Sequence, residues 1–441
     1  MASPSIKPLM LMADQDGNIY EHPELLMVCR QGENFSLPRP DELMPLPAES
    51  ELFLLPGRRA VGLDEESGEL EILEETAVAA FVSPAHTLSG HAAYVNEGNA
   101  PTLPLFAYGA VGYANGRFYV CARRVDKDNR QVFCDIPQAA IKREARKLTQ
   151  KFPKNRLMQH LMEKCALTYA CPAARNLALG RYEAPLPVSR VCNARCIGCI
   201  SAQDPDSKIQ TTPQCRLTFT PSPEEIVEVM LQHGQRETNT PVYSFGQGCE
   251  GEPLTEAETI IKAIALFREK EAEQGLVKGT VNINTNASRP EMMTSLARAG
   301  LSSMRVSLNS LRPEVYERYY RPQSYSFNDV LQSIKTAKDN GVFISLNLLY
   351  FPGVSDGELE IAALTDALET YKIDFIQLRN LNIDPEMYIE LMQGIEFGPN
   401  AGLNNFRKRI QRACPHVQFG YFNPYLDKDG NVIPSGAAQS T

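Results

Sequence analysis

The second half of the chain alternates short apolar runs with amphipathic helix patterns, and this repeat constrains the fold more than any other feature. Helix-capping sequences of the form Ser/Thr-x-x-Glu begin 33, 33 and 67 residues apart, and a helix pattern after Ser326 fills the double gap. Strand-like runs precede these helices, so we expect parallel strands joined by helical crossovers. The capping sequences are Ser222/Glu225, Thr255/Glu258, Ser288/Glu291 and Ser355/Glu358.

The number of these units predicts a barrel that does not close. Six strands are expected between residues 184 and 385, which is fewer than the eight of a closed barrel of strand–helix units. We therefore predict an α/β fold with a partial barrel over 184–385 and a C-terminal extension over 386–441. The expected strands are 186–190, 241–245, 280–286, 303–309, 342–349 and 373–379.

Polar residues occupy alternate positions in the later strands of this predicted barrel. Because side chains alternate between the two faces of a strand, each polar set lies on one face, and helices should cover the other, apolar face. We therefore expect a polar ligand cavity inside the barrel; the alternative is that these groups only satisfy one another. They are Asn282, Asn284, Asn286, Arg305, Ser307, Asn309, Ser345, Asn347, Gln377 and Arg379.

Two further segments precede the barrel. Residues 1–136 are predicted to be a β-rich domain, in which Asn115-Gly116 is typical of a two-residue hairpin. This domain could select or cover a substrate, or it could cap the open barrel edge. Residues 137–183 are predicted to be a helical connector with a basic face. That face could pack on an acidic neighbour or bind an anionic polymer such as RNA.

Composition narrows the function classes. The net charge is −9, with 44 Lys+Arg against 53 Asp+Glu, which argues against a surface built to coat nucleic acid. The longest uncharged stretch, 76–96, is too polar for a membrane span, and no signal peptide is recognisable, so a cytoplasmic protein is expected. Eleven cysteines without an export signal indicate ligands, catalysts or buried thiols rather than disulfides, and the six scattered histidines argue against a His-based zinc enzyme.

Three of the cysteines form a compact motif. Cys192, Cys196 and Cys199 follow the first predicted barrel strand with spacings of four and three residues. Three thiolates on one loop can bind three irons of a cubane cluster, which leaves the fourth iron open to a small-molecule ligand.

This loop resembles the radical S-adenosylmethionine (SAM) superfamily, whose hallmark is Cys-x3-Cys-x2-Cys after the first strand of a partial (β/α)6 TIM-like barrel. Gly251-Glu252-Pro253, after the second strand, resembles the family motif that holds the SAM amino group. The chain departs from the family at Gly198, where an aromatic residue near the adenine is common, and at Glu250, where the family often has Gly.

The resemblance implies further SAM contacts along the later strands. Arg318 or Arg321 is a candidate for the SAM carboxylate, because a guanidinium fork suits that group. The other implied contacts are Asn286, Ser307, Asn309 and Asn347.

The resemblance also implies an activity. A [4Fe-4S] cluster and SAM would generate a 5′-deoxyadenosyl radical, which would abstract hydrogen from an unknown peptide or small molecule. A low-potential donor of flavodoxin or ferredoxin type would supply the electron. Two alternatives are a radical SAM enzyme that modifies RNA, and a non-catalytic metal or electron-transfer module built on the motif cysteines and Cys215.

Other cysteines could carry additional chemistry. Cys165, Cys171 and Cys215, together with Cys249 and Cys414, could assemble an auxiliary cluster, or they could be small buried residues. Cys249 and Glu250 lie in the predicted cofactor loop and are candidate catalytic groups; the alternative for Cys249 is a loop residue without chemistry.

Overall fold

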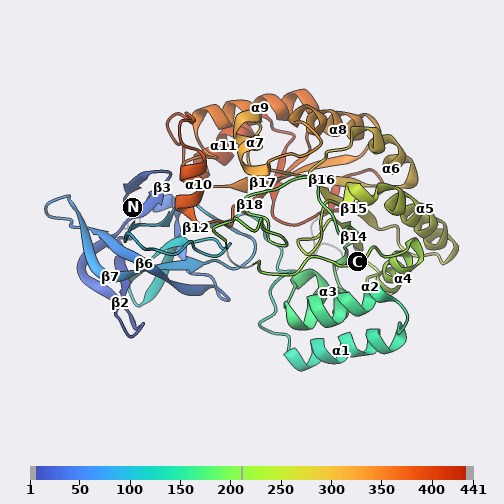
Figure 1. The fold of residues 1–441 in the computed structure, drawn as a ribbon, viewed down its shortest axis with the longest axis horizontal. Coiled ribbons are helices and arrows are strands. Elements are labelled where there is room, and N and C mark those ends of the chain that lie inside the picture. Colours follow the sequence, from blue (N-terminus) through green and yellow to red (C-terminus); the bar gives the residue numbers. More distant parts are fainter. Residues whose placement is uncertain (1–5, 210–211, 434–441) are drawn as a thin grey trace.

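The N-terminal part is a single antiparallel sheet, as Figure 1 shows in blue. The computed structural model describes residues 6–209 and 212–433. The predicted hairpin is confirmed: β11 and β12 pair from Ala114 and Arg117 around a turn in which Asn115 and Gly116 have positive φ. The elements are β1 (Leu9–Ala13), β2 (Ile19–Met27), β3 (Cys29–Gln31), β4 (Asn34–Ser36), η1 (Pro40–Glu42), β5 (Leu43–Pro45), β6 (Glu51–Leu63), β7 (Leu70–Phe81), β8 (His86–Leu88), β9 (His91–Ala92), β10 (Tyr94–Asn96), β11 (Gly109–Ala114) and β12 (Arg117–Arg124).

A helical connector follows and packs against the first strand and the first helix of the next domain. One segment has π-helical winding, which is rare in proteins. Some of the basic side chains pair with neighbouring acids, as in the 2.7 Å contact between Arg156 and Glu225. The elements are α1 (Gln138–Lys151), α2 (Arg156–Gln159), the π-helix η2 (His160–Thr168) and α3 (Pro172–Leu179).

The C-terminal part contains one parallel sheet in which the strands pair in chain order. Five of the six predicted strands are present within two residues of the expected bounds. The first was expected at 186–190 but is formed by Glu183–Leu186, so it shares only Leu186 with the prediction, and a seventh strand, β19, pairs with β18 at the edge. β13 and β19 do not pair with each other within the described residues, so the sheet is an open, partial barrel. The strands are β13 (Glu183–Leu186), β14 (Val242–Phe245), β15 (Thr280–Thr285), β16 (Ser303–Leu308), β17 (Phe343–Tyr350), β18 (Phe375–Asn380) and β19 (Gln418–Gly420).

Helices form an arc around the outside of this sheet (Figure 1). They bury the apolar face of the strands, as at Met304, Val306 and Leu308 of β16. No helix in the described ranges is long and apolar enough to cross a bilayer. The remaining elements are α4 (Pro223–Gly234), η3 (Pro253–Glu256), α5 (Ala257–Glu273), η4 (Pro290–Met292), α6 (Met293–Ala299), α7 (Pro313–Tyr320), α8 (Phe327–Asp339), α9 (Glu358–Tyr371), α10 (Pro385–Leu391), α11 (Leu403–Ala413), β20 (Tyr425–Leu426) and β21 (Val432–Ile433).

The helix starts match the predicted capping boxes only in part. Ser222 caps α4 with the predicted box, and Ser326 caps α8 through Asp329. The boxes predicted at Thr255, Ser288 and Ser355 are wrong, because these residues bond within the loops that follow the strands: the Thr255 hydroxyl, for example, donates to the Glu252 carbonyl 2.8 Å away.

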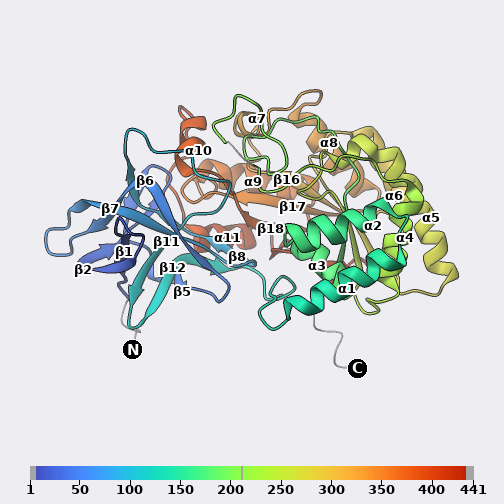
Figure 2. The same ribbon diagram turned by 60° about the horizontal axis from the view of Figure 1, so that its bottom comes forward.

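The N-terminal sheet lies beside β18, which contacts β8 (Figure 2). Thr87 donates to the Leu378 carbonyl at 2.9 Å, and the Leu88 amide donates to the Asn380 side chain at 2.8 Å. Arg58 forms a buried ion pair with Asp384. The N-terminal sheet therefore forms one wall beside the barrel mouth.

Candidate active site

The three motif cysteines lie on a loop clamped on both sides by backbone hydrogen bonds. On one side, the amides of Gly251 and Glu252 each donate across 2.9 Å, to the carbonyls of Ser189 and Val191. On the other side, the end of α7 provides the partners: Ile197 donates to the Tyr319 carbonyl at 3.0 Å, and the Gln323 amide donates to the Asn193 carbonyl at 2.9 Å. The loop that holds Cys192, Cys196 and Cys199 is therefore fixed between the loop after β14 and the end of α7.

Gly251 is required for this close approach. A Cβ atom at this position would overlap the carbonyl oxygen of Val191. Gly246 directly follows β14 and has φ +78°, and a Cβ atom at this position would overlap the carbonyl oxygen of Asn284. Both glycines let the loop after β14 press against its neighbours.

The motif thiols are partly buried. Burial raises the pKa of Cys192 to about 11 and that of Cys196 well above its usual value. The guanidinium of Arg216 lies 3.7 Å from the Cys199 sulfur and provides a positive charge there. Two buried thiols that are hard to ionise, with a third beside a guanidinium, suit a multiply charged metal centre that stabilises thiolates.

Two buried glutamates follow Cys249 and bind backbone amides. Glu250 accepts from the amides of Val188, Ser189 and Gln247 at 2.7–2.8 Å, so its carboxylate holds the end of β13. Glu252 accepts from the amides of Asn286 and Leu254 and from the Thr285 hydroxyl. Burial raises the pKa of Glu250 to about 8 and that of Glu252 to about 7. Pro253 begins the short helix η3.

Tyr319 occupies the space beside Gly198. A Cβ atom at Gly198 would lie 2.5 Å from the Tyr319 hydroxyl oxygen, and Tyr319 is 4% exposed. An aromatic ring from α7 therefore fills the place next to the last motif cysteine, where the motif itself carries no side chain.

The polar residues predicted to bind SAM gather at the ends of β15, β16 and β17. Asn286 donates to the Asn193 side chain at 2.8 Å, which connects this group to the cysteine loop. Asn347 donates to the Ser307 hydroxyl at 3.4 Å. Within the described residues, the carbonyl oxygens of the Asn309 and Asn347 side chains are buried and have no hydrogen-bond partner. Buried acceptors of this kind suit a ligand that donates hydrogen bonds.

The two candidate arginines have different surroundings. Arg318 donates to the carbonyls of Leu391 and Gln393, at 3.0 and 2.8 Å, so its guanidinium is occupied by backbone. Arg321 instead lines a hollow of about 600 Å³ together with Arg195 and Cys196. Of the two, Arg321 is the one placed beside the cysteine loop and next to open space.

The other candidate cysteines lie away from this hollow. Cys165 and Cys249 meet a third residue, His160, in a group described below. Cys171 lies beside them, since its amide donates to the Cys165 carbonyl at 2.8 Å. Cys215 is exposed, and Cys414 is buried beneath α11.

Comparison with known proteins identifies the domain. A family model described as the radical SAM superfamily matches residues 186–365. Residues 186–365, which form most of the barrel, belong to the radical SAM superfamily. This match confirms the family that the cysteine motif and Gly251-Glu252-Pro253 resemble.

Individual relatives are distant. A GTP 3′,8-cyclase of Petrotoga mobilis is 25% identical over 251 residues, which cover 55% of this radical SAM chain and 67% of that protein. Molybdenum cofactor biosynthesis protein 1 of Bos taurus is 26% identical over 196 residues, covering 43% of this chain and 28% of its own length. Among solved structures, HydG, a maturase of the [FeFe]-hydrogenase, aligns with a TM-score of 0.39 and 16% identity over 64% of this chain and 67% of HydG.

The cofactors of the radical SAM superfamily are a [4Fe-4S] cluster and SAM, and this chain has groups that fit both. The three thiols of the clamped loop are a donor set of the type that such a cluster requires. The buried acceptors of Asn309 and Asn347, and Arg321 beside the hollow, are polar groups of the type that would suit an amino acid and a ribose.

Three residues were not identified from the sequence: Tyr319 and Arg216 of this site, and His160 of the separate group described below. Tyr319 and Arg216 lie in segments that carry no motif, and only the folded chain brings them to the cysteine loop. His160 was one of several scattered histidines. The absent aromatic residue at Gly198 was the one available signal, because it indicated that another ring must fill that place.

A double-mutant cycle tests the Gly198–Tyr319 contact. Gly198→Ala is expected to weaken SAM binding and destabilise the protein by about 1–3 kcal/mol, because its Cβ meets a buried hydroxyl. Tyr319→Phe alone should change little. In the double variant the nearest ring carbon is 3.3 Å away, so most of the loss should be recovered. Calorimetric SAM titration and thermal unfolding measure both effects; strictly additive losses would contradict the contact.

Proposed function

We propose that this protein is a radical SAM enzyme that abstracts hydrogen from a small anionic molecule bound inside the barrel. When bound, the cluster and SAM supply a 5′-deoxyadenosyl radical after one-electron reduction, and this radical takes a hydrogen atom from the substrate. The observation that carries the choice of substrate class is a pair of arginines on the inner face of the barrel, Arg305 and Arg379.

Arg305 lies on β16 between Asn284 of β15 and Ser345 of β17 in the strand register. It donates to the Gln377 side chain at 3.0 Å, while its Nε is buried without a partner among the described residues. Burial, followed by the charge of Arg379, lowers the pKa of Arg305 to about 9. An unpaired buried donor next to a second cation favours an arriving anion.

Arg379 lies at the end of β18. It donates to the Tyr421 carbonyl at 2.9 Å, and its guanidinium lies 3.9 Å from the centre of the Tyr421 ring. No aspartate or glutamate in the described residues forms an ion pair with either arginine. Glu183 is the acid that acts on Arg305, and its carboxylate already accepts from Asn423 at 2.8 Å.

A carboxylate or phosphate would balance this excess charge, and guanidinium forks bind both groups in bidentate fashion. Nucleotides are the first molecules to test, because relatives bear the name GTP 3′,8-cyclase. These relatives are only 25–26% identical to this chain, so their substrate is a starting point for the search.

The residues of this chain have separate tasks in the proposed reaction. Cys192, Cys196 and Cys199 hold the cluster, and Arg321 holds the SAM carboxylate. The Gly251–Pro253 loop and the amides and hydroxyls of Asn286, Ser307, Asn309 and Asn347 orient the rest of SAM. The N-terminal sheet beside the mouth limits access of water to the radical. We propose that a flavodoxin or ferredoxin type protein donates the electron.

RNA is the less favoured substrate. In the basic connector, Arg156 is paired with Glu225 of α4, and Arg236 of the barrel contacts Glu144 of α1 at 3.6 Å. These ion pairs hold the connector against the barrel. Salt-dependent binding of RNA to the intact protein would instead support RNA as the substrate.

Anaerobic turnover tests the proposed function. The reconstituted protein is mixed with SAM, dithionite and either GTP deuterated at C3′ or a panel of deuterated phosphates and carboxylates. Deuterium in 5′-deoxyadenosine identifies the substrate. Arg305→Gln and Arg379→Gln should each raise KM by about 10–100-fold, since a hydrogen bond to a charged group contributes about 1.5–3 kcal/mol.

Arg298→Gln on α6 provides the matched control, because Arg298 is exposed on the outside of the barrel. Unchanged KM values in both inner arginine variants would contradict the anionic substrate. No 5′-deoxyadenosine under any condition would contradict the enzyme itself.

A further inference from the structure

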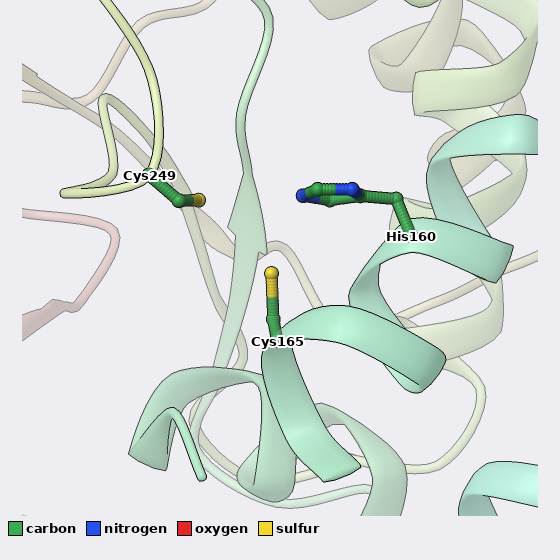
Figure 3. A group of neighbouring side chains, drawn as sticks. All are labelled: His160, Cys165 and Cys249. Carbon is green, nitrogen blue, oxygen red and sulfur yellow. The ribbon is translucent and has the colours of Figure 1, made fainter. Parts of the chain in front are cut away.

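A second group of metal-ligating side chains lies outside the cysteine loop. His160, Cys165 and Cys249 each direct one ligand atom toward a common centre, and these atoms all lie within 4.8 Å of one another (Figure 3). His160 and Cys165 come from the connector, and Cys249 comes from the loop after β14. The proposed reaction does not use them.

The π-helix η2 brings the first two ligands together. His160 and Cys165 are five residues apart, and in a π-helix the amide of residue i+5 bonds to the carbonyl of residue i. Residues with this spacing therefore lie one turn apart on the same side. In an α-helix they would point in different directions. The rare winding spans His160–Thr168 and so begins at the first ligand.

The ligand atoms of this group are withdrawn from solvent. Nε2 of His160 is buried without a hydrogen-bond partner in the described part of the chain. Cys165 is 2% exposed and Cys249 is 5% exposed. A buried imidazole nitrogen that faces two thiols is a costly arrangement unless a ligand satisfies it.

The spacing of the ligand atoms favours a single ion over a cluster. Sulfur and nitrogen ligands of one tetrahedral zinc ion lie about 3.5–3.8 Å apart, given bonds of about 2.3 and 2.0 Å. In a cubane, each thiolate binds a different iron at a different corner, so the thiolates lie farther apart. Cys192, Cys196 and Cys199, all of them described, do not form a group as tight as His160, Cys165 and Cys249.

We propose that His160, Cys165 and Cys249 bind one divalent ion of the zinc type. Imidazole and thiolate are ligands that Zn²⁺ prefers, and two thiolates with one imidazole leave a fourth position for water. The two thiols would lose their protons to solvent when the ion binds. The ion would link the connector to the loop that continues into Glu250, Gly251 and Glu252.

Metal analysis of the purified protein tests this site. The reconstituted wild-type chain is expected to contain about one zinc and about four irons. His160→Ala, Cys165→Ala and Cys249→Ala should each lose the zinc and keep the irons. The triple variant of Cys192, Cys196 and Cys199 to Ala should lose the irons and keep the zinc. Cys414→Ala, a buried cysteine elsewhere, is the matched control and should keep both metals.

Two further variants separate ligation from folding and from cluster binding. His160→Cys replaces one zinc ligand by another and should retain the ion even where His160→Ala fails to fold. Cobalt in place of zinc should give a thiolate-to-cobalt absorption that disappears in Cys249→Ala. The double variant Cys171→Ser with Cys215→Ser should keep zinc.

Two results would overturn the proposal. One is a wild-type protein with about eight irons and no zinc, in which the Cys171/Cys215 double variant falls to about four irons, since this would show a second cluster. The other is zinc content that does not change in the His160, Cys165 and Cys249 variants. Because the readout is metal content, failure of this site and failure of the proposed enzymatic activity are distinguished.

Discussion

Replacement of Cys192, Cys196 or Cys199 by alanine is expected to lower SAM cleavage at least about a thousandfold, which corresponds to about 4 kcal/mol. Each thiol is one of only three protein ligands that the loop offers to the cluster, and backbone bonds to Ser189, Val191 and Tyr319 fix the loop in place. A missing ligand cannot be replaced by a neighbouring sulfur, because Cys249 points toward His160 instead.

The measurement is 5′-deoxyadenosine formation under anaerobic conditions, together with iron content and visible absorbance. Cys414→Ala is the control, because it removes a buried thiol far from the cysteine loop and should leave the rate unchanged. Unfolding curves of the iron-free proteins should be similar for wild type and variants. SAM cleavage that survives in any motif variant would contradict the cluster assignment.

Replacement of Arg58 by alanine is expected to destabilise the protein by about 3–5 kcal/mol, because it leaves a buried carboxylate without its partner. Arg58 and Asp384 are each 3% exposed, and their atoms Nη2 and Oδ2 are 2.8 Å apart. Arg58 also donates to the carbonyls of Pro56 and Pro101. This pair joins the N-terminal sheet to the loop after β18.

A double variant separates the charge from the packing. Asp384 accepts from the amides of Leu103 and Glu386, and asparagine keeps an acceptor for them. Arg58→Met with Asp384→Asn removes both charges and should be less destabilised than the sum of the single variants. Denaturant unfolding measures the free energies, and limited proteolysis reports release of the N-terminal sheet. A loss below about 1 kcal/mol in Arg58→Ala would indicate that solvent reaches the pair.

Much of the barrel could be predicted from local patterns. Strand–helix units repeat along the chain, and each strand needs only its own apolar alternation to be recognised, so β14 to β18 were predicted nearly in place, whereas β13 was predicted too late in the chain. The seventh, β19, is three residues long and follows the short helices α10 and α11, so it has no pattern of its own. It becomes a strand because β18 offers it an unpaired edge.

Helix starts were less predictable. A hydroxyl followed three residues later by a carboxylate can cap a helix, but it can equally bond inside a loop. Ser222 caps a helix, whereas Thr255 and Ser355 bond inside loops. In the loops after the barrel strands, the competing partners come from distant segments: Thr255 bonds to Ser189 as well as to Glu252.

The cysteine loop could be located from the chain alone because its three ligands lie within eight consecutive residues, and local spacing sets their geometry. Tyr319 and Gly198 touch, and the charges of Arg305 and Arg379 influence each other, although these residues come from different strands, helices and loops. Only strand register and helix packing bring them together. His160, Cys165 and Cys249 come together for two reasons. The segment that holds His160 and Cys165 has an unusual helical winding, and that helix packs on the loop after β14. Neither leaves a signature in local spacing, because the winding and the docking depend on contacts between segments that are far apart in the chain.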